Sequence, residues 1–109
     1  MSGVPIDALS KKVALVSDRY AKRCDIRRDD DWYALKLVEE VGELNAEYLR
    51  LTGRGRTKGK TIPQIRDDLG AECADVLAHL LLFAQNNNID LEKELREKWF
   101  VYLDKNDHD

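Results

Sequence analysis

KLVEEVGELNAEYL, residues 36–49, pairs the apolar spacing of an amphipathic helix with a cluster of acidic side chains. Its apolar residues, with the leucine that follows, recur in steps of three and four: Leu37, Val41, Leu44, Tyr48 and Leu51. This is the period of a helix that buries one face. Glu40 and Glu43 flank that stripe three residues apart, so a helix projects both carboxylates from one side. Because isolated charge is costly to bury, the segment predicts a helix whose carboxylates face a compensating positive charge.

A second acidic pair lies in ECADVLAHLLLFAQNNNIDL, residues 72–91. Glu72 and Asp75 are again three residues apart, and Asp68, Glu72, Asp75 and His79 form a polar ridge along an otherwise apolar helix. Two such helices facing each other create an acidic hole that a cation stabilises. Carboxylate oxygens are the ligands that hard divalent cations prefer. The two pairs together therefore predict a divalent-cation site inside a helical protein.

The rest of the sequence also follows a helical period rather than a strand-like one. We expect four helices, over about residues 6–24, 32–51, 64–87 and 91–103. Asp29 to Asp31 are candidate N-caps of the second helix and Asp90 of the fourth, and the asparagines at 86–88 suit a left-handed C-cap. Residues 52–64, TGRGRTKGKTIPQ, predict a flexible basic loop. The predicted fold class is all-α, a four-helix bundle forming one domain over residues 1–109.

Length and charge narrow the class of protein further. The chain has 109 residues, of which 43% are hydrophobic, so its core is thin for four helices and we expect a homodimer or homotetramer. Charged residues of both signs are interspersed and the net charge is −3, which argues against a nucleic-acid partner. No apolar run approaches the roughly 18 residues that span a bilayer, and the N-terminus lacks an apolar signal core. We therefore expect a cytoplasmic protein with no membrane partner.

The cysteines and the charged pairs also have ordinary structural interpretations. Cys24 and Cys73 show no metal-binding spacing, and Cys73 is expected to be a small buried thiol. Acidic residues on helices usually form solvated faces with basic partners, as Lys36 with Glu40 and Glu47 with Arg50 would do. EEVGE at 39–43 is harder to explain in this way, because it stacks three like charges within two turns.

EEVGE followed by ECAD at 72–75 resembles the signature of the MazG-like nucleotide pyrophosphohydrolases, E-E-x-x-E, a variable spacer and E-x-x-D. The 28 residues that separate the two halves place this chain at the long end for the family. The resemblance extends from about Trp32 to Lys98. It implies an all-α protomer assembled as a dimer or a dimer of dimers, with the active site in a bundle cavity partly walled by the second subunit.

The resemblance also implies an activity and a set of site residues. The family hydrolyses a nucleoside triphosphate to the monophosphate and pyrophosphate with Mg²⁺, sometimes Mn²⁺. The motif positions that would hold the metal are Glu40, Glu43, Glu72 and Asp75. Glu39 would hold a further ion or position the attacking water. The residue chemistry agrees, since phosphoryl transfer needs charge neutralisation and an in-line water. The chain shows neither a P-loop nor a G-x-S-x-G motif for competing chemistry.

Several residues are candidates for binding the substrate. Lys98 matches a lysine often found near the phosphate site of the family, and Trp32 an aromatic residue that stacks on the base. Lys36 adjoins the acidic motif, and the loop arginines Arg54 and Arg56 could meet a polyanionic substrate or simply keep the loop solvated. Trp32 could equally fasten the start of its helix to the core.

Two further positions have weaker matches. His79 either hydrogen-bonds a ligand carboxylate or lies satisfied in the core. Asn106 is a weak match to a downstream asparagine of the family, because the KNDHD ending departs from the usual basic one.

Two other functions remain open at the level of sequence. One is phosphoribosyl-ATP pyrophosphatase, another all-α pyrophosphohydrolase, whose glutamate-rich helix and D-x-x-x-H-like helix resemble DVLAHLLLF at 75–83. The other is a non-catalytic helical assembly module, in which each acid would have a basic partner within one turn. Glu43, Glu72 and Asp75 have no such partner four residues away.

Overall fold

All regular structure in the described part of the chain, residues 5–103 of a computed structural model, is helical. The elements are α1 (Ile6–Cys24), α2 (Asp30–Leu51), α3 (Ile62–Asn86), α4 (Leu91–Lys98) and a short 3-10 helix, Phe100–Leu103. The all-α prediction is thereby confirmed. No helix within residues 5–103 combines the length and apolar character needed to cross a membrane.

Side-chain caps set the helix ends. The Asp29 carboxylate accepts a hydrogen bond from the Trp32 backbone N–H at 2.8 Å, so α2 begins at Asp30, two residues before the expected start. Asp90 caps α4 in the same way, through the Lys93 N–H at 3.1 Å. Asn88 has a φ of 56°, the left-handed conformation expected of the asparagine run.

The third and fourth helices differ from the sequence expectation at one end each. Thr61 and Gln64 form a reciprocal capping box, so α3 begins at Ile62 and its first turn includes Pro63. Proline is tolerated there because the first-turn N–H groups have no partner within the helix. Residues 62–64 are therefore helix and not the end of the loop. At the other end of the chain, α4 stops at Lys98 and residues 100–103 tighten into 3-10 geometry.

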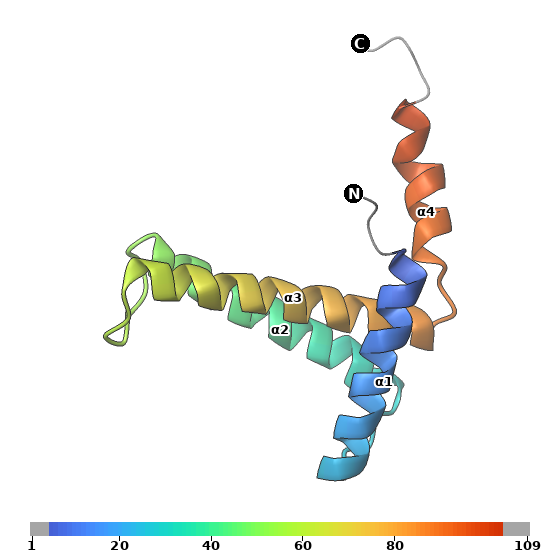
Figure 1. The fold of residues 1–109 in the computed structure, drawn as a ribbon, viewed down its shortest axis with the longest axis horizontal. Coiled ribbons are helices and arrows are strands. Elements are labelled where there is room, and N and C mark those ends of the chain that lie inside the picture. Colours follow the sequence, from blue (N-terminus) through green and yellow to red (C-terminus); the bar gives the residue numbers. More distant parts are fainter. Residues whose placement is uncertain (1–4, 104–109) are drawn as a thin grey trace.

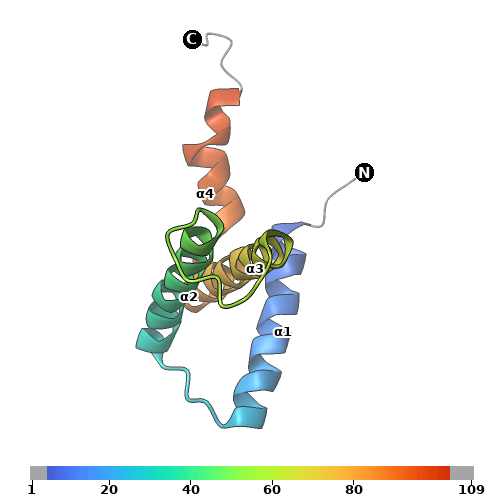
Figure 2. The ribbon, with the colours of Figure 1, turned by 90° about the vertical axis from the view of Figure 1, so that its left-hand side faces the viewer.

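α2 and α3 pack side by side as a hairpin joined by residues 52–61, and α1 packs on α3 at the end away from that loop (Figures 1 and 2). Polar contacts join the segments at this end. The Gln85 amide donates to the Ser10 carbonyl at 2.8 Å, and the Asn86 amide donates to Asp30 at 2.9 Å. Among residues 5–103, the buried apolar side chains are Ala21, Ile65, Leu81, Leu82 and Ala84, of which Ile65 is fully buried.

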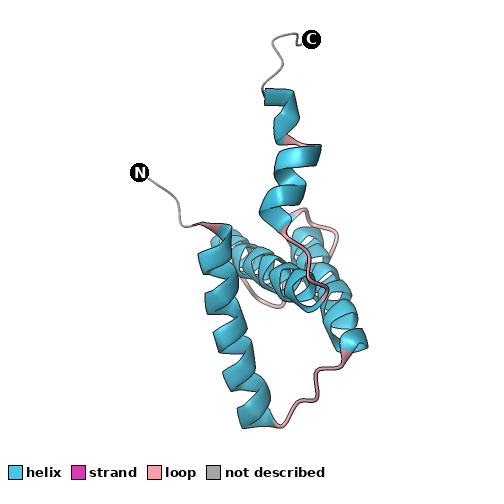
Figure 3. Cartoon of the chain, turned by 90° about the vertical axis from the view of Figure 1, so that its right-hand side faces the viewer, coloured by secondary structure: helices cyan, strands magenta, loops and turns pink. Residues whose placement is uncertain are grey.

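α4 projects away from the other helices (Figures 1 and 3). Among residues 5–103, it makes extensive contact only with the 3-10 helix that follows it. Trp99 is 64% exposed, so it does not belong to the core of the protomer. α4 and the 3-10 helix therefore gain little stability from the rest of the protomer.

One side of the α2–α3 hairpin carries apolar side chains in contact with solvent. We call it the apolar back face, and it comprises Val41, Tyr48, Cys73, Leu77 and Leu80. At about 100° per residue, Cys73 and Leu77 lie on the opposite side of α3 from Asp75. The prediction that Cys73 is a buried thiol is wrong for the protomer, because Cys73 is exposed on this face.

Replacing Thr61 with alanine should lower the free energy of unfolding by about 1 kcal/mol, because it removes the side-chain acceptor at the start of α3. Urea denaturation followed by circular dichroism measures the change. Thr57→Ala, in the exposed loop, is the matched control and should change stability by less than about 0.5 kcal/mol. Equal effects of the two substitutions would contradict the capping role.

Candidate functional site

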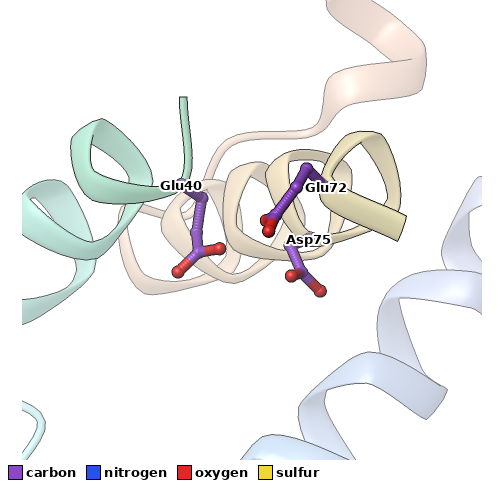
Figure 4. Close-up of side chains that lie close together, drawn as sticks. All are labelled: Glu40, Glu72 and Asp75. Carbon is purple, nitrogen blue, oxygen red and sulfur yellow. The ribbon is translucent and has the colours of Figure 1, made fainter. Parts of the chain in front are cut away.

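Three carboxylates from the two hairpin helices converge at one point. Glu40 of α2 and Glu72 and Asp75 of α3 each offer an oxygen atom, and these atoms all lie within 4.8 Å of one another. Figure 4 shows the three side chains extending from the two helices toward a common space. Glu40 and Glu72 are half-buried and Asp75 is exposed. We call this group the acidic triad.

Glu72 is the most electrostatically strained member of the triad. Its Oε1 atom is buried and has no hydrogen-bond partner among the described residues. Burial raises the pKa of the Glu72 carboxyl, and the neighbouring carboxylates of Asp75, Glu40 and Glu43 raise it further. Both causes act against the charged form. A cation at the triad would relieve both, because it would supply the missing partner and neutralise the repulsion.

Lys36 neutralises the outer edge of the same site. Its ammonium Nζ lies 2.7 Å from a Glu39 oxygen and 3.6 Å from a Glu40 oxygen. The hydrogen bond to Glu39 raises the pKa of Lys36 against the effect of burial, and the same bond lowers the pKa of Glu39. Glu39 is therefore engaged with Lys36, and only Glu40 of this pair reaches the triad.

Glu43 lies on the same side of α2 as Glu39 but does not join the triad. Its side chain is exposed, and the group of converging oxygens consists of Glu40, Glu72 and Asp75. Its charge still acts on Glu72, as the raised pKa of Glu72 shows. Glu43 thus lies beside the triad. Its role as a metal ligand stays a prediction.

A cleft of about 470 Å³ opens next to the triad, between α1 and the hairpin. Its walls include Tyr20, Trp32, Lys36, Asp75 and His79, so one triad carboxylate borders an aromatic-lined space. The Trp32 and His79 rings meet edge to face, with centroids 5.9 Å apart. Trp32 therefore packs against His79 and also lines the cleft, and its stacking on a base stays a prediction.

His79 is a polar group in this cleft with unused hydrogen-bonding capacity. Its Nδ1 atom is buried and has no partner within the described chain. Burial lowers the pKa of His79, against the opposing attraction of Glu40 and Asp75, so the neutral ring is favoured. A neutral imidazole can donate from one nitrogen and accept at the other.

α1 contributes cleft residues that the sequence did not single out. Lys12, Ser17 and Tyr20 line the wall opposite the hairpin. They were missed because α1 shows no acidic motif, and its stripe Leu9, Val13, Val16 and Tyr20 resembles an ordinary core face. The sequence feature that could have indicated them is the presence of polar residues next to the stripe, since Lys12 and Ser17 each adjoin one of its valines.

Other candidates lie away from the triad. Arg54 and Arg56 are exposed in the loop beyond Leu51, and Leu51 is about 16 Å along the α2 axis from Glu40. The Arg54 guanidinium donates to Thr52 at 3.2 Å, and the Arg56 carbonyl accepts from Arg50 at 3.0 Å. Lys98 ends the projecting α4. Asn106 lies outside the described residues.

Glu47 differs from its expected solvated setting. It is 8% exposed, and its Oε2 atom accepts a hydrogen bond from the Arg50 guanidinium at 2.6 Å. Glu40 and Glu47 are seven residues apart, two helical turns, so both face α3. The pair that sequence reasoning assigned to a surface is thus part of the hairpin interior.

The donor set of the triad suits a small hard cation. Three carboxylates from two facing helices can supply oxygen ligands while leaving positions for water and substrate. The unpartnered Oε1 of Glu72 is the observation that favours such an ion, because an orphaned buried oxygen is otherwise costly. No family model, curated protein or solved structure matches this chain.

Replacing Glu72 with glutamine should raise the stability of the metal-free protein at pH 7. A carboxyl whose pKa is raised by folding binds its proton more tightly in the folded state, so its contribution to stability falls as pH rises above 4.5. Thermal unfolding in EDTA from pH 4.5 to 7 should show a gain for Glu72→Gln that grows with pH. Asp67→Asn, at an exposed α3 position, is the control, and an equal gain there would contradict the strain assigned to Glu72.

Proposed function

We propose that this chain is a Mg²⁺-dependent nucleotide pyrophosphohydrolase, which converts a nucleoside triphosphate or deoxynucleoside triphosphate to the monophosphate and pyrophosphate. The observation that carries the proposal is the acidic triad with its unpartnered Glu72 oxygen, bordering an aromatic-lined cleft. The resemblance of EEVGE and ECAD to the MazG-like signature supports the choice of reaction. Mn²⁺ is the alternative cation, since its ligand preferences are similar.

Each residue of the site has a role in this proposal. Glu40, Glu72 and Asp75 would hold the cation, which when bound neutralises charge on the phosphates. Glu43, beside the triad, would be a further ligand of the cation. Glu39 would orient the attacking water and take its proton. The water oxygen forms a bond to the α-phosphorus while the bond from that phosphorus to the bridging oxygen breaks. Intact pyrophosphate leaves.

The cleft gives the nucleoside a place beside the acids. Asp75 lines the cleft and also belongs to the triad, so phosphates at the triad leave the rest of the substrate facing Trp32 and His79. Stacking of a base on an aromatic ring contributes about 1–3 kcal/mol. Lys36 lines the same cleft, and its ammonium group lies 3.6 Å from a Glu40 oxygen, close to phosphates bound at the triad. Arg54, Arg56 and Lys98 are not part of the proposed site of one protomer.

We further propose that a second copy covers the apolar back face, so that two α2–α3 hairpins form a four-helix bundle. The accessible surface of the chain is 8537 Å², whereas a compact monomer of this mass exposes about 6,200 Å². The ten terminal residues outside the described range, even if fully extended, leave an excess of about 1,000 Å². A standard interface removes about 800 Å² from each partner, so the excess suffices for a stable dimer.

Asp75→Asn should lower turnover of nucleoside triphosphates at least about 100-fold, because losing a ligand should cost more than losing a residue that merely supports one. Mg²⁺ at 100 times its Kd should stabilise the wild-type protein by about 2.7 kcal/mol and the variant much less. Pyrophosphate release and thermal unfolding provide the two readouts, with Asp67→Asn as the control. Unchanged turnover and unchanged Mg²⁺ stabilisation in Asp75→Asn would refute the site.

The substrate and the bond cleaved need separate measurements. Assays with canonical and modified nucleotides and with phosphoribosyl-ATP distinguish the proposed activity from phosphoribosyl-ATP pyrophosphatase. In ¹⁸O-water the label should enter the monophosphate, since water attacks the α-phosphorus. Label in pyrophosphate would place the attack at the β-phosphorus. A protein that neither turns over these substrates nor responds to Mg²⁺ would instead be an assembly module.

Leu77→Glu should reduce the mass measured by light scattering at micromolar concentration, because it buries a charge in the centre of the proposed four-helix contact. The native cysteines report on the same surface. A thiol reagent should modify Cys24 quickly in both proteins, and Cys73 quickly only in the variant. Leu15→Glu, 50% exposed on α1, is the matched control. A wild-type monomer with a reactive Cys73 would exclude this interface.

A further inference from the structure

Residues 91–103, which we call the arm, comprise α4 and the 3-10 helix. The arm extends away from the other helices, and extensive contacts join only its two parts (Figures 1 and 3). Apolar side chains concentrate at its far end and are at least one-third exposed: Leu95, Trp99, Phe100, Val101, Tyr102 and Leu103. Such a concentration of exposed apolar surface marks an interaction site in soluble proteins.

A groove of about 570 Å³ lies at the base of the arm, between the first turns of α1 and α4 and the end of α3. Leu81 and Ile89 contribute apolar surface to the groove, and the carboxylates of Asp7, Asp90 and Glu92 line it. Asp7 pairs with Lys11 at 3.2 Å and Glu92 with Arg96 at 3.6 Å, whereas no ion pair forms at Asp90 among residues 5–103. This groove is separate from the acidic triad, none of whose members lines it.

We propose that the arm is an exchange element: its apolar end docks in the basal groove of a second copy, while the second copy's arm docks in the groove of the first. The end of the arm is chemically matched to the groove. Trp99 and Phe100 supply large apolar groups for the apolar surface of the groove. Lys98, adjacent to them, supplies a cation for its carboxylates.

The charges within the arm leave Lys98 available for this contact. Lys93 pairs with Glu97 at 3.8 Å and Arg96 pairs with Glu92 at 3.6 Å, both within α4. Among residues 5–103, no ion pair forms at Lys98. An ion pair across the contact would direct the partner arm to the acidic groove.

The geometry of the arm excludes docking in its own groove. α4 and the 3-10 helix together extend about 20 Å, and the groove lies at the near end of this length. The far end therefore cannot reach the groove of the same chain while α4 remains helical. When two arms pack antiparallel, the far end of each arm lies at the base of the other. One two-fold contact then covers the apolar ends of both arms.

This contact is independent of the proposed function and separate from the apolar back face. The groove draws on α1, the end of α3 and α4, whereas the back face lies on α2 and the middle of α3. Two different two-fold contacts on one chain close into a tetramer when their axes intersect at right angles. Arm exchange alone would build a dimer.

Opposite charges introduced at the two sides of the contact test the exchange. Ile89→Lys changes the groove and Trp99→Glu changes the arm, at positions 41% and 64% exposed in the protomer. Each variant alone should halve the mass measured by sedimentation, because it places a charge against an apolar partner at both contacts. Circular dichroism confirms that each variant remains helical.

An equimolar mixture of the two variants should recover the wild-type mass. In that pair, the introduced lysine meets the introduced glutamate at one contact, and the other contact keeps its native residues. Leu15→Glu, exposed on α1, should change nothing. The inference is overturned if both single variants keep the wild-type mass, or if both lose it and their mixture does not recover it. Cys73 labelling should be unchanged throughout, which separates this contact from the back face.

Discussion

The electrostatic repulsion within the acidic triad is the constraint on which the rest of the site depends. Packing α2 against α3 brings Glu40, Glu72 and Asp75 together, and the packing that fixes them also removes water from a Glu72 oxygen. The packing of the hairpin therefore places three like charges together at a cost in free energy. Lys36 offsets part of this at the Glu39 and Glu40 edge. The remaining repulsion is what the cation of the proposed function would relieve.

The two sides of the hairpin differ in the side chains that they carry. Asp75 and the cleft face α1, and the exposed apolar side chains of the back face lie opposite. This separation follows from helix geometry, since residues two apart lie about 200° apart around the axis. Asp75 and Leu77 are such a pair. Substitutions on one side of the hairpin can therefore test the proposed site without altering the proposed assembly surface on the other.

The helices and the acidic pairs were predictable because both depend on local spacing. The period of LVEEVGEL and the caps Asp29 and Asp90 act within a few residues, so the sequence alone contains them. The cleft depends on how α1 crosses the hairpin, which no local pattern encodes, and Lys12 and Ser17 were missed for that reason. Cys73 and Glu47 were assigned to the wrong environments because the spacing of apolar residues along one helix does not say which of its sides a neighbouring helix covers.

The connection between α2 and α3 has a kinetic consequence. A loop of ten residues, 52–61, joins the two helices that share the largest contact in the protomer. Contacts between segments so close in sequence form early, because closing a short loop takes tens of nanoseconds and costs little chain entropy. The hairpin and its acidic triad therefore arise in a unimolecular step whose rate is independent of protein concentration. Any association of chains follows as a slower, second-order phase.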